Sequence, residues 1–228
     1  KRFLQKQFLM YKTLWKEIMT EDTRRIEYRF LHWGPFVCHY KLLSEEIKEL
    51  KSLESGEDYK KELAGHLDDE KSLDKNKVFK VLLPYLNSYN QGYFDYRRIP
   101  LCTGFELETA WINRQSKNEF NPPHTHDGHL SFVIYTEIPD GLEEECRSAV
   151  HNSPGPGCIT FDFNLPFDSV GTKLFLTTHS HLPSVGDMFI FPAILPHWVY
   201  PFKKTNGKRV SISGNIKLKH AEKMLRKK

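Results

Sequence analysis

The sequence predicts a mainly β protein with some helix: residues 1–100 should be mostly helical, and residues 101–228 should form two facing antiparallel sheets. Three observations lead to this prediction. Apolar side chains recur at helical spacing in the first hundred residues, short strand-like runs fill the remainder, and turn-forming pairs with Gly or Pro separate those runs. We therefore expect one structural domain, in which a helical layer packs on a sandwich or jelly roll.

The first hundred residues contain three predicted helices and one short strand. Residues 3–20 form a basic amphipathic segment, which we expect to pack on the core. A break at Gly34-Pro35 precedes a short strand over residues 36–40. The second helix is expected to begin at Ser44, a plausible N-cap followed by two glutamates, and to end at Gly56. The third should span Val78–Tyr89.

Seven strand-like runs follow Pro100, and turn residues separate most of them. They are Phe105–Arg114, His129–Ile138, Gly157–Phe163, Lys173–Thr178, Gly186–Phe191, His197–Phe202 and Arg209–Leu218. Asn206-Gly207 favours a tight reversal between the last two runs. We therefore expect these two strands to pair, with His197 and Arg209 on neighbouring strands of one sheet.

Charge and cysteine usage limit the class of protein. A net charge of +4, from 33 basic and 29 acidic residues, is too balanced to indicate nucleic-acid binding. The four cysteines include no CxxC pair, which favours reduced thiols in a cytosolic protein. No apolar run approaches the length of a membrane span, and no secretory signal is visible. We therefore expect a cytoplasmic protein.

The segment Asn121–Asp127 contains two histidines, His124 and His126, two residues apart. Because residues i and i+2 of a strand point to the same side, both imidazoles can face one point. His197, in a later strand-like run, can supply a third ligand and leave the other side of a metal ion open. These three histidines are the predicted metal ligands.

Polar side chains share a face with these candidates. Asn113 has the same strand parity as Trp111, and Tyr135 the same as Ser131 and Val133. This face either lines a site for a polar ligand or faces solvent, and the alternation alone favours neither.

Arg209, Ser211 and Ser213 alternate with apolar residues on the last strand. An arginine fork with a serine beside it suits a carboxylate, although Arg209 would equally suit a salt bridge to a nearby acid. Taken with three histidines, the pattern suits a small dicarboxylate that chelates a metal at one end and pairs with Arg209 at the other.

This combination resembles the Fe(II)/2-oxoglutarate-dependent dioxygenases, whose fold is a double-stranded β-helix of the jelly-roll type. Their H-x-D/E, distal His and R-x-S pattern is matched here at positions His124, His126, His197, Arg209 and Ser211. More narrowly, residues 104–217 resemble hydroxylase-like proteins of phages and bacteria. The shared runs are W-x-N at Trp111–Asn113, S-x-x-x-Y at Ser131–Tyr135, G-D at Gly186-Asp187 and F-P at Phe191-Pro192.

The resemblance implies a hydroxylase that uses Fe(II), 2-oxoglutarate and O2, with iron on the three histidines. It also implies that Arg209 and Ser211 hold the far carboxylate of 2-oxoglutarate, with Tyr135 and Asn113 as candidates for hydrogen bonds to it. One departure matters: His126 stands where the superfamily has an acid. Asp127 is an alternative ligand if the chain bends before Gly128.

Two other kinds of protein share parts of this pattern. A metal cupin would explain the histidines, but it expects a glutamate near Leu130 or Ser131 and explains neither Arg209 nor Ser211. A non-catalytic β-sandwich module with a structural zinc is the second alternative. A further H-x-H, His179-Ser180-His181, lacks an R-x-S partner at a suitable distance.

The substrate and the oligomeric state are not readable from the sequence. The substrate could be a protein side chain, a nucleobase, a sugar or a small metabolite, and the charge balance does not indicate nucleic acid as a partner. A phage-encoded protein would act in the host cytoplasm, and no membrane is expected as a partner.

Overall fold

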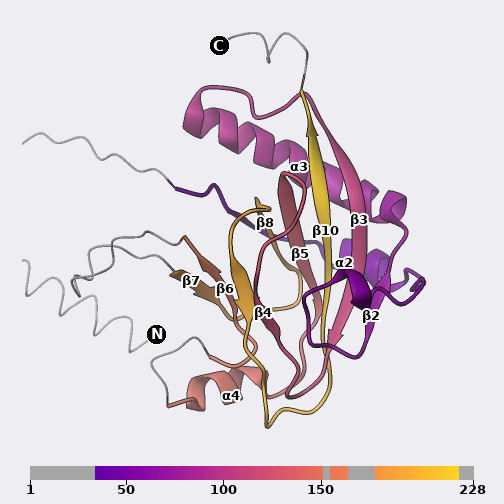
Figure 1. Cartoon of the computed structure of the whole chain (residues 1–228), viewed down its shortest axis with the longest axis vertical. Helices are drawn as coiled ribbons and strands as arrows, with labels where there is room; N and C mark the ends of the chain where they lie inside the picture. The colour runs from indigo at the N-terminus through magenta and orange to yellow at the C-terminus, as the bar shows by residue number, and fades with distance from the viewer. Residues whose placement is uncertain (1–33, 151–154, 164–177, 221–228) are drawn as a thin grey trace, which may run out of the picture. The chain divides into compact units, whose positions relative to one another are not determined.

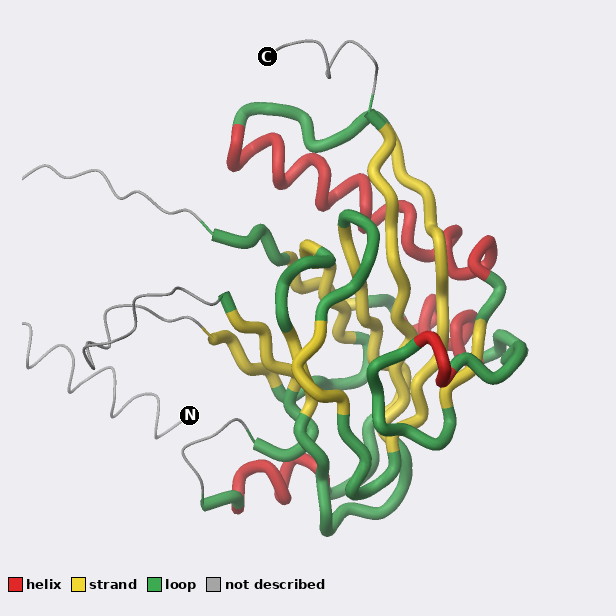
Figure 2. Tube along the Cα trace, in the orientation of Figure 1, coloured by secondary structure: helices red, strands yellow, loops and turns green. Residues whose placement is uncertain are grey.

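The computed structural model describes residues 34–150, 155–163 and 178–220, all within one compact unit that spans Gly34–Lys228. The helix expected over residues 3–20 and most of the strand expected over Lys173–Thr178 lie outside the described residues. Two antiparallel sheets form the framework, as Figures 1 and 2 show. No helix among the described residues is long and apolar enough to cross a bilayer.

The larger sheet has six strands in the order β1-β8-β5-β10-β3-β2. Their bounds are Cys38–Lys41 (β1), Glu70–Ser72 (β2), Gly104–Gln115 (β3), Leu130–Glu137 (β5), Asp187–Pro192 (β8) and Arg209–Lys219 (β10). The smaller sheet has the order β4-β9-β6-β7, with strands Asn121–His124 (β4), Ile159–Asp162 (β6), Thr178–His181 (β7) and His197–Val199 (β9). From β3 to β10 the chain passes back and forth between the two sheets, except that β6 and β7 follow each other as an antiparallel pair in the smaller sheet. This alternation produces the double-stranded β-helix and confirms the predicted fold class.

Three α-helices and a 3-10 turn complete the described part of the chain: α2 (Ser44–Lys51), α3 (Lys75–Arg97), α4 (Leu142–Ser148) and η1 (Lys60–Glu62). The apolar face of α3 packs on the larger sheet, where Leu82 and Leu86 join one buried cluster with Ile112, Ile134 and Ile212. Figure 1 shows α3 crossing behind the strands of this sheet, on the side away from β4 and β6.

The opposite face of the larger sheet packs against the smaller sheet. Val133, Phe189 and Phe191 form a second buried cluster there with Ile159 and Phe161. Successive residues of a strand point to opposite faces of the sheet. The side chains of β3, β5 and β10 are therefore divided between the apolar core under α3 and the space between the two sheets. The polar face predicted from the sequence lies in that space rather than on a solvent-exposed surface.

Several element boundaries differ from expectation. Ser44 is the first residue of α2 rather than its N-cap, because Leu43 occupies the cap position and its N–H donates to the Glu46 carboxylate at 2.8 Å. That helix ends at Lys51, before Gly56, whereas α3 is much longer than predicted. The front half of the chain also supplies the two edge strands β1 and β2. The division into a helical layer over residues 1–100 and a β core over residues 101–228, within one structural domain, stays a prediction.

The predicted pairing of the His197 and Arg209 strands is wrong. β9 pairs with β4 and β6, while β10 lies between β3 and β5 in the other sheet. The Glu145 carboxylate explains the difference, since it accepts hydrogen bonds from the N–H groups of Lys203, Lys204 and Thr205 at 2.6 to 3.0 Å. These bonds hold the connection in a crossover between the sheets, so a two-residue hairpin does not form.

Candidate metal and 2-oxoglutarate site

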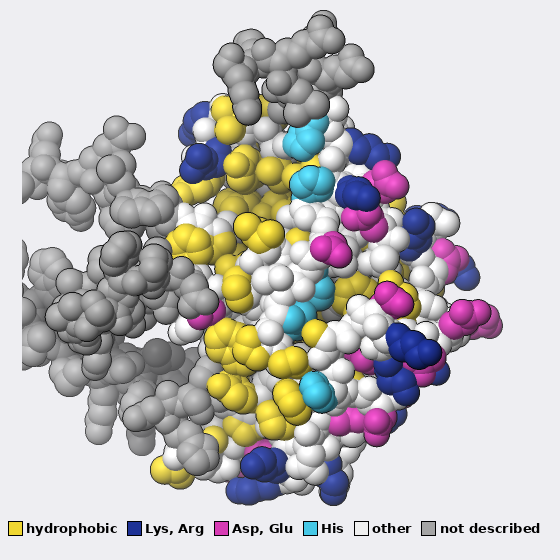
Figure 3. All heavy atoms as spheres, in the orientation of Figure 1, with side chains coloured by type: hydrophobic (Ala, Val, Ile, Leu, Met, Phe, Trp, Pro, Cys, Tyr) yellow, Lys and Arg dark blue, Asp and Glu magenta, His cyan; other side chains and the backbone are white. Residues whose placement is uncertain are grey.

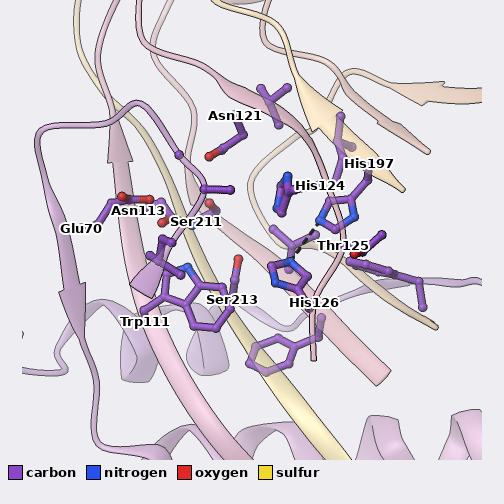
Figure 4. Close-up of a pocket in the computed structure, with 18 of the residues that line it drawn as sticks. Glu70, Trp111, Asn113, Asn121, His124, Thr125, His126, His197, Ser211 and Ser213 are labelled. Atoms are coloured by element: carbon purple, nitrogen blue, oxygen red, sulfur yellow. Dashed lines mark hydrogen bonds between the residues drawn. The ribbon is translucent and has the colours of Figure 1, made fainter. Parts of the chain in front are cut away.

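A pocket of about 180 Å³ opens between the two sheets. Side chains of β3, β5 and β10 line one wall, β4 and β9 supply the other, and Glu62–Gly65 with Glu70 lies at one side. Figure 4 shows His124, His126 and His197 on one side of this space and Asn113, Ser211 and Ser213 across it. The pocket therefore brings the H-x-H segment and the R-x-S strand together, although they belong to different sheets.

The three predicted metal ligands converge. His124 ends β4 and His197 begins β9, and the two are direct partners in the antiparallel pair. His126 lies two residues beyond β4, so the expectation that it shares a strand with His124 is wrong in detail. Its N–H donates to the Ala193 carbonyl at 2.9 Å, which turns the segment toward β9. The Nε2 atoms of His126 and His197 are 3.2 Å apart, and one donor atom of each histidine lies within 4.8 Å of the others.

Backbone carbonyls set the tautomers of two of these histidines. His124 Nδ1 lies 2.7 Å from the Pro122 carbonyl oxygen, and His197 Nδ1 lies 2.9 Å from that of Leu195. A carbonyl oxygen only accepts, so both Nδ1 atoms carry the proton and both Nε2 atoms present a lone pair, which in His197 faces His126 Nε2. Outer hydrogen bonds of this kind orient histidines that bind metals.

Burial also keeps the imidazoles neutral. Desolvation, followed by the proximity of His124, lowers the pKa of His126 to about 4. Desolvation lowers the pKa of His124 as well, and that of His197 lies well below the ordinary value. Three unprotonated nitrogen donors that face one another fit a borderline divalent cation such as Fe²⁺ or Zn²⁺.

Asp127 does not join this group in the structure. The chain bends there, and Gly128 adopts a positive φ of 89°, yet the Asp127 side chain is exposed and does not line the pocket. Among the described residues, the donor set around this point consists of three imidazoles.

Arg209 is buried beside the pocket without a counter-ion. Its Nη1 donates to Gln115 Oε1 at 2.6 Å, and its Nη2 donates to the Tyr135 hydroxyl at 3.1 Å. Within the described part of the chain no carboxylate pairs with Arg209, and its Nε has no hydrogen-bond partner. Since an uncompensated buried charge is costly, the guanidinium is suited to receive an anion.

Neighbouring strands carry the other predicted residues. Ser211 lies opposite Asn113 on one side and Tyr135 on the other, and all three side chains are buried along the pocket. The Asn113 Oδ1 atom has no partner among the described groups, which leaves it free to accept a bond from a ligand. Burial raises the pKa of Tyr135, so its hydroxyl stays protonated.

Sequence reasoning missed two polar residues of this region. Gln115, which orients Arg209, lies two residues after Asn113 on the same face of β3, so continued alternation would have found it. Glu70 on β2 lines the pocket, its Oε2 atom has no partner among the described residues, and no local sequence pattern marks it. Of the second H-x-H, His179 is exposed and His181 contacts Asp187, and neither lines this pocket.

Comparison with known proteins gives one family match. Residues 109–215 match the model of a family described as "Putative 2OG-Fe(II) oxygenase". No curated protein matches the chain.

Similar solved structures include a Pseudomonas putida prolyl-4-hydroxylase, with 16% identity, 81% of this chain and 94% of that chain covered, and a TM-score of 0.49. The viral collagen prolyl hydroxylase of Paramecium Bursaria Chlorella virus-1, in complex with 2OG, is 15% identical, with 79% of this chain and 95% of that chain covered and a TM-score of 0.46. HygX from Streptomyces hygroscopicus, with nickel, 2-oxoglutarate and hygromycin B bound, is 12% identical, with 81% of this chain and 84% of that chain covered and a TM-score of 0.48.

The matched segment contains all three histidines of the cluster, together with Arg209 and Ser211. Its family uses Fe(II), 2-oxoglutarate and O2, which are the cofactors that the resemblance implies. The family match indicates a 2-oxoglutarate- and Fe(II)-dependent oxygenase and confirms the resemblance predicted from the sequence.

Proposed function

We propose that this chain is a hydroxylase whose iron is held by His124, His126 and His197 and whose 2-oxoglutarate is anchored by Arg209. One observation carries the proposal: three neutral imidazoles converge in a pocket that also receives a buried guanidinium, and among the described residues that guanidinium has no counter-ion. A metal-binding carboxylic acid with a second, distant carboxylate satisfies both features at once.

Each residue has a defined task in this proposal. The three histidines fix the metal through their Nε2 atoms, and the Pro122 and Leu195 carbonyls keep two of those rings oriented. When bound, Fe(II) with 2-oxoglutarate and O2 supplies the oxidising chemistry that hydroxylates a C–H bond.

On the facing wall, Gln115 and Tyr135 hydrogen-bond to the Arg209 guanidinium and orient it. Its remaining N–H groups can then donate to the far carboxylate of 2-oxoglutarate. Ser211 adds a donor to that carboxylate, and Asn113 through its amide N–H and Tyr135 through its hydroxyl donate hydrogen bonds to the cosubstrate. The apolar side chains packed between the two sheets limit the access of water to the reacting groups.

The substrate class is a small molecule or a protein side chain that can present a carbon atom at the open end of the pocket. Lysine, arginine, aspartate and glutamate side chains are interspersed on the face shown in Figure 3, over the edge that carries β2 and β3. Mixed charge of this kind supports neither nucleic acid nor an anionic membrane as the partner of this face. The resemblance to phage proteins and the absence of CxxC pairs favour a cytoplasmic site of action.

A turnover assay tests the proposal. The Fe(II)-loaded protein should convert 2-oxoglutarate to succinate and consume O2, even without a known substrate, at a slow uncoupled rate. His124→Ala should lose metal, and Arg209→Ala should keep metal but bind 2-oxoglutarate poorly. Arg114→Ala is the matched control, since Arg114 pairs with Asp69 rather than lining the pocket.

The opposite results are equally clear. Tight zinc binding without any 2-oxoglutarate binding would favour the non-catalytic module with a structural zinc. Unchanged cosubstrate affinity in Arg209→Ala would remove the role proposed for the guanidinium.

A further inference from the structure

A second cluster of metal-ligating side chains lies outside the pocket. It consists of His39 on β1, His181 on β7 and Asp187 on β8. His39 Nε2 lies 3.2 Å from Asp187 Oδ1, and His181 Nε2 lies 3.0 Å from Asp187 Oδ2. The two imidazole rings lie 4.9 Å apart between centroids. None of the three residues lines the pocket of the first histidine group.

The Asp187 carboxylate receives more donors than it can satisfy. Besides the two imidazoles, Lys41 Nζ approaches Oδ1 at 3.0 Å, and both the N–H and the hydroxyl of Ser184 donate to Oδ2 at 2.7 and 3.1 Å. A carboxylate offers about four lone-pair sites, and five groups converge on this one. Two of those groups are imidazoles, which can present a lone pair instead of a proton.

The spacing suits a shared cation. In a tetrahedral zinc site with bonds of about 2.0 to 2.1 Å, ligand atoms lie about 3.3 Å apart. The two nitrogen–oxygen separations are close to that value, although they reach different oxygens of the carboxylate, and one ligand atom of each of the three residues lies within 4.8 Å of the others.

We propose that His39, His181 and Asp187 form a second divalent-metal site, separate from the pocket, that takes Zn²⁺ or a similar borderline ion such as Co²⁺ or Ni²⁺. Water completes the coordination, because His39 and His181 are partly exposed. Ser184 keeps the carboxylate oriented. The Lys41 side chain, which is 57% exposed, can turn into solvent when the cation binds.

The position in the fold suggests a structural role. β1 is an edge strand of the larger sheet, and β7 is an edge strand of the smaller sheet with β6 as its hydrogen-bonded neighbour. A metal held by His39, His181 and Asp187 joins β7 directly to β1 and β8. The ion would therefore tie the free edge of one sheet to the other, and its binding energy would add to the stability of the fold.

Metal titration of the whole protein tests this proposal. With Co²⁺ or Zn²⁺ as the probe, the wild type should bind about two equivalents, and the double variant His39→Gln/His181→Gln should bind about one. His179→Gln is the matched control, because that exposed residue of β7 lies outside the cluster. His124→Ala should lose the other equivalent and retain the one assigned to the second site.

Thermal unfolding gives an independent readout. Excess Zn²⁺ should raise the Tm of His124→Ala, and this rise should vanish when His39→Gln and His181→Gln are added. If the combined variant does not fold, His39→Gln alone provides the test, since that side chain is 44% exposed. A wild type whose only equivalent is lost in His124→Ala, or two equivalents retained in the double variant, would overturn the proposal and leave the cluster as an ion-pair network around Asp187.

Discussion

Glu70 provides a prediction whose magnitude follows from its surroundings. Its side chain is 1% exposed on β2, beside the pocket, and its Oε2 atom has no partner among the described groups. Burial, with smaller contributions from Glu119 and Asp58, raises the pKa of Glu70 to about 7 from a reference value of 4.5. The folded protein therefore holds a proton on Glu70 across a pH range in which the unfolded chain has lost it.

The sign of the effect on stability follows from proton linkage. Because the folded-state pKa is the higher one, Glu70 lowers the free energy of unfolding as pH rises from about 4.5, and the loss is complete above about 7. One pKa unit corresponds to about 1.4 kcal/mol, so the full cost is at most roughly 3 kcal/mol. Glu70→Gln keeps the shape of the side chain and removes the titration.

Urea unfolding between pH 5 and pH 8 measures the effect. Glu70→Gln should exceed the wild type in stability by about 1 kcal/mol or less near pH 5 and by about 2 to 3 kcal/mol by pH 8. Glu62→Gln is the control, because this exposed carboxylate lines the same pocket. A difference between Glu70→Gln and wild type that does not change with pH would refute the reasoning.

Three further outcomes are expected. Arg209→Lys should weaken 2-oxoglutarate binding about 10- to 100-fold in a spectroscopic titration, because lysine lacks the planar fork; unchanged binding would contradict the anchor. Leu82→Ala should lower the free energy of unfolding by about 2 to 5 kcal/mol in urea, since Leu82 is fully buried under the larger sheet; a loss below about 1 kcal/mol would argue against this packing. Glu145→Gln should cost about 1 to 3 kcal/mol by the same assay, because the carboxylate holds the 203–205 crossover; a neutral effect would count against that role.

Local sequence signals predicted much of the fold. Alternating apolar residues identified the strands that became β3, β5 and β10, and the same parity separated Ile112 from Asn113. The H-x-H and R-x-S patterns marked residues that the fold brings to one pocket. These features depend on neighbours within a few positions of the chain, which is why they were readable.

The features that were missed depend on contacts between distant residues. The crossover after β9 is held by Glu145, 58 to 60 positions before the backbone groups that it binds. His126 is turned by the Ala193 carbonyl rather than by strand geometry. His39, His181 and Asp187 come from three separate strands of two sheets, so no spacing in the sequence indicates their cluster.

Addition of 2-oxoglutarate to the Fe(II)-loaded protein under anaerobic conditions is the most direct test of the shared histidine site. The wild type should develop a weak visible charge-transfer band, and His197→Ala should lose both the band and the iron that produces it. An undiminished band in His197→Ala would contradict the assignment of His124, His126 and His197 to one iron ion.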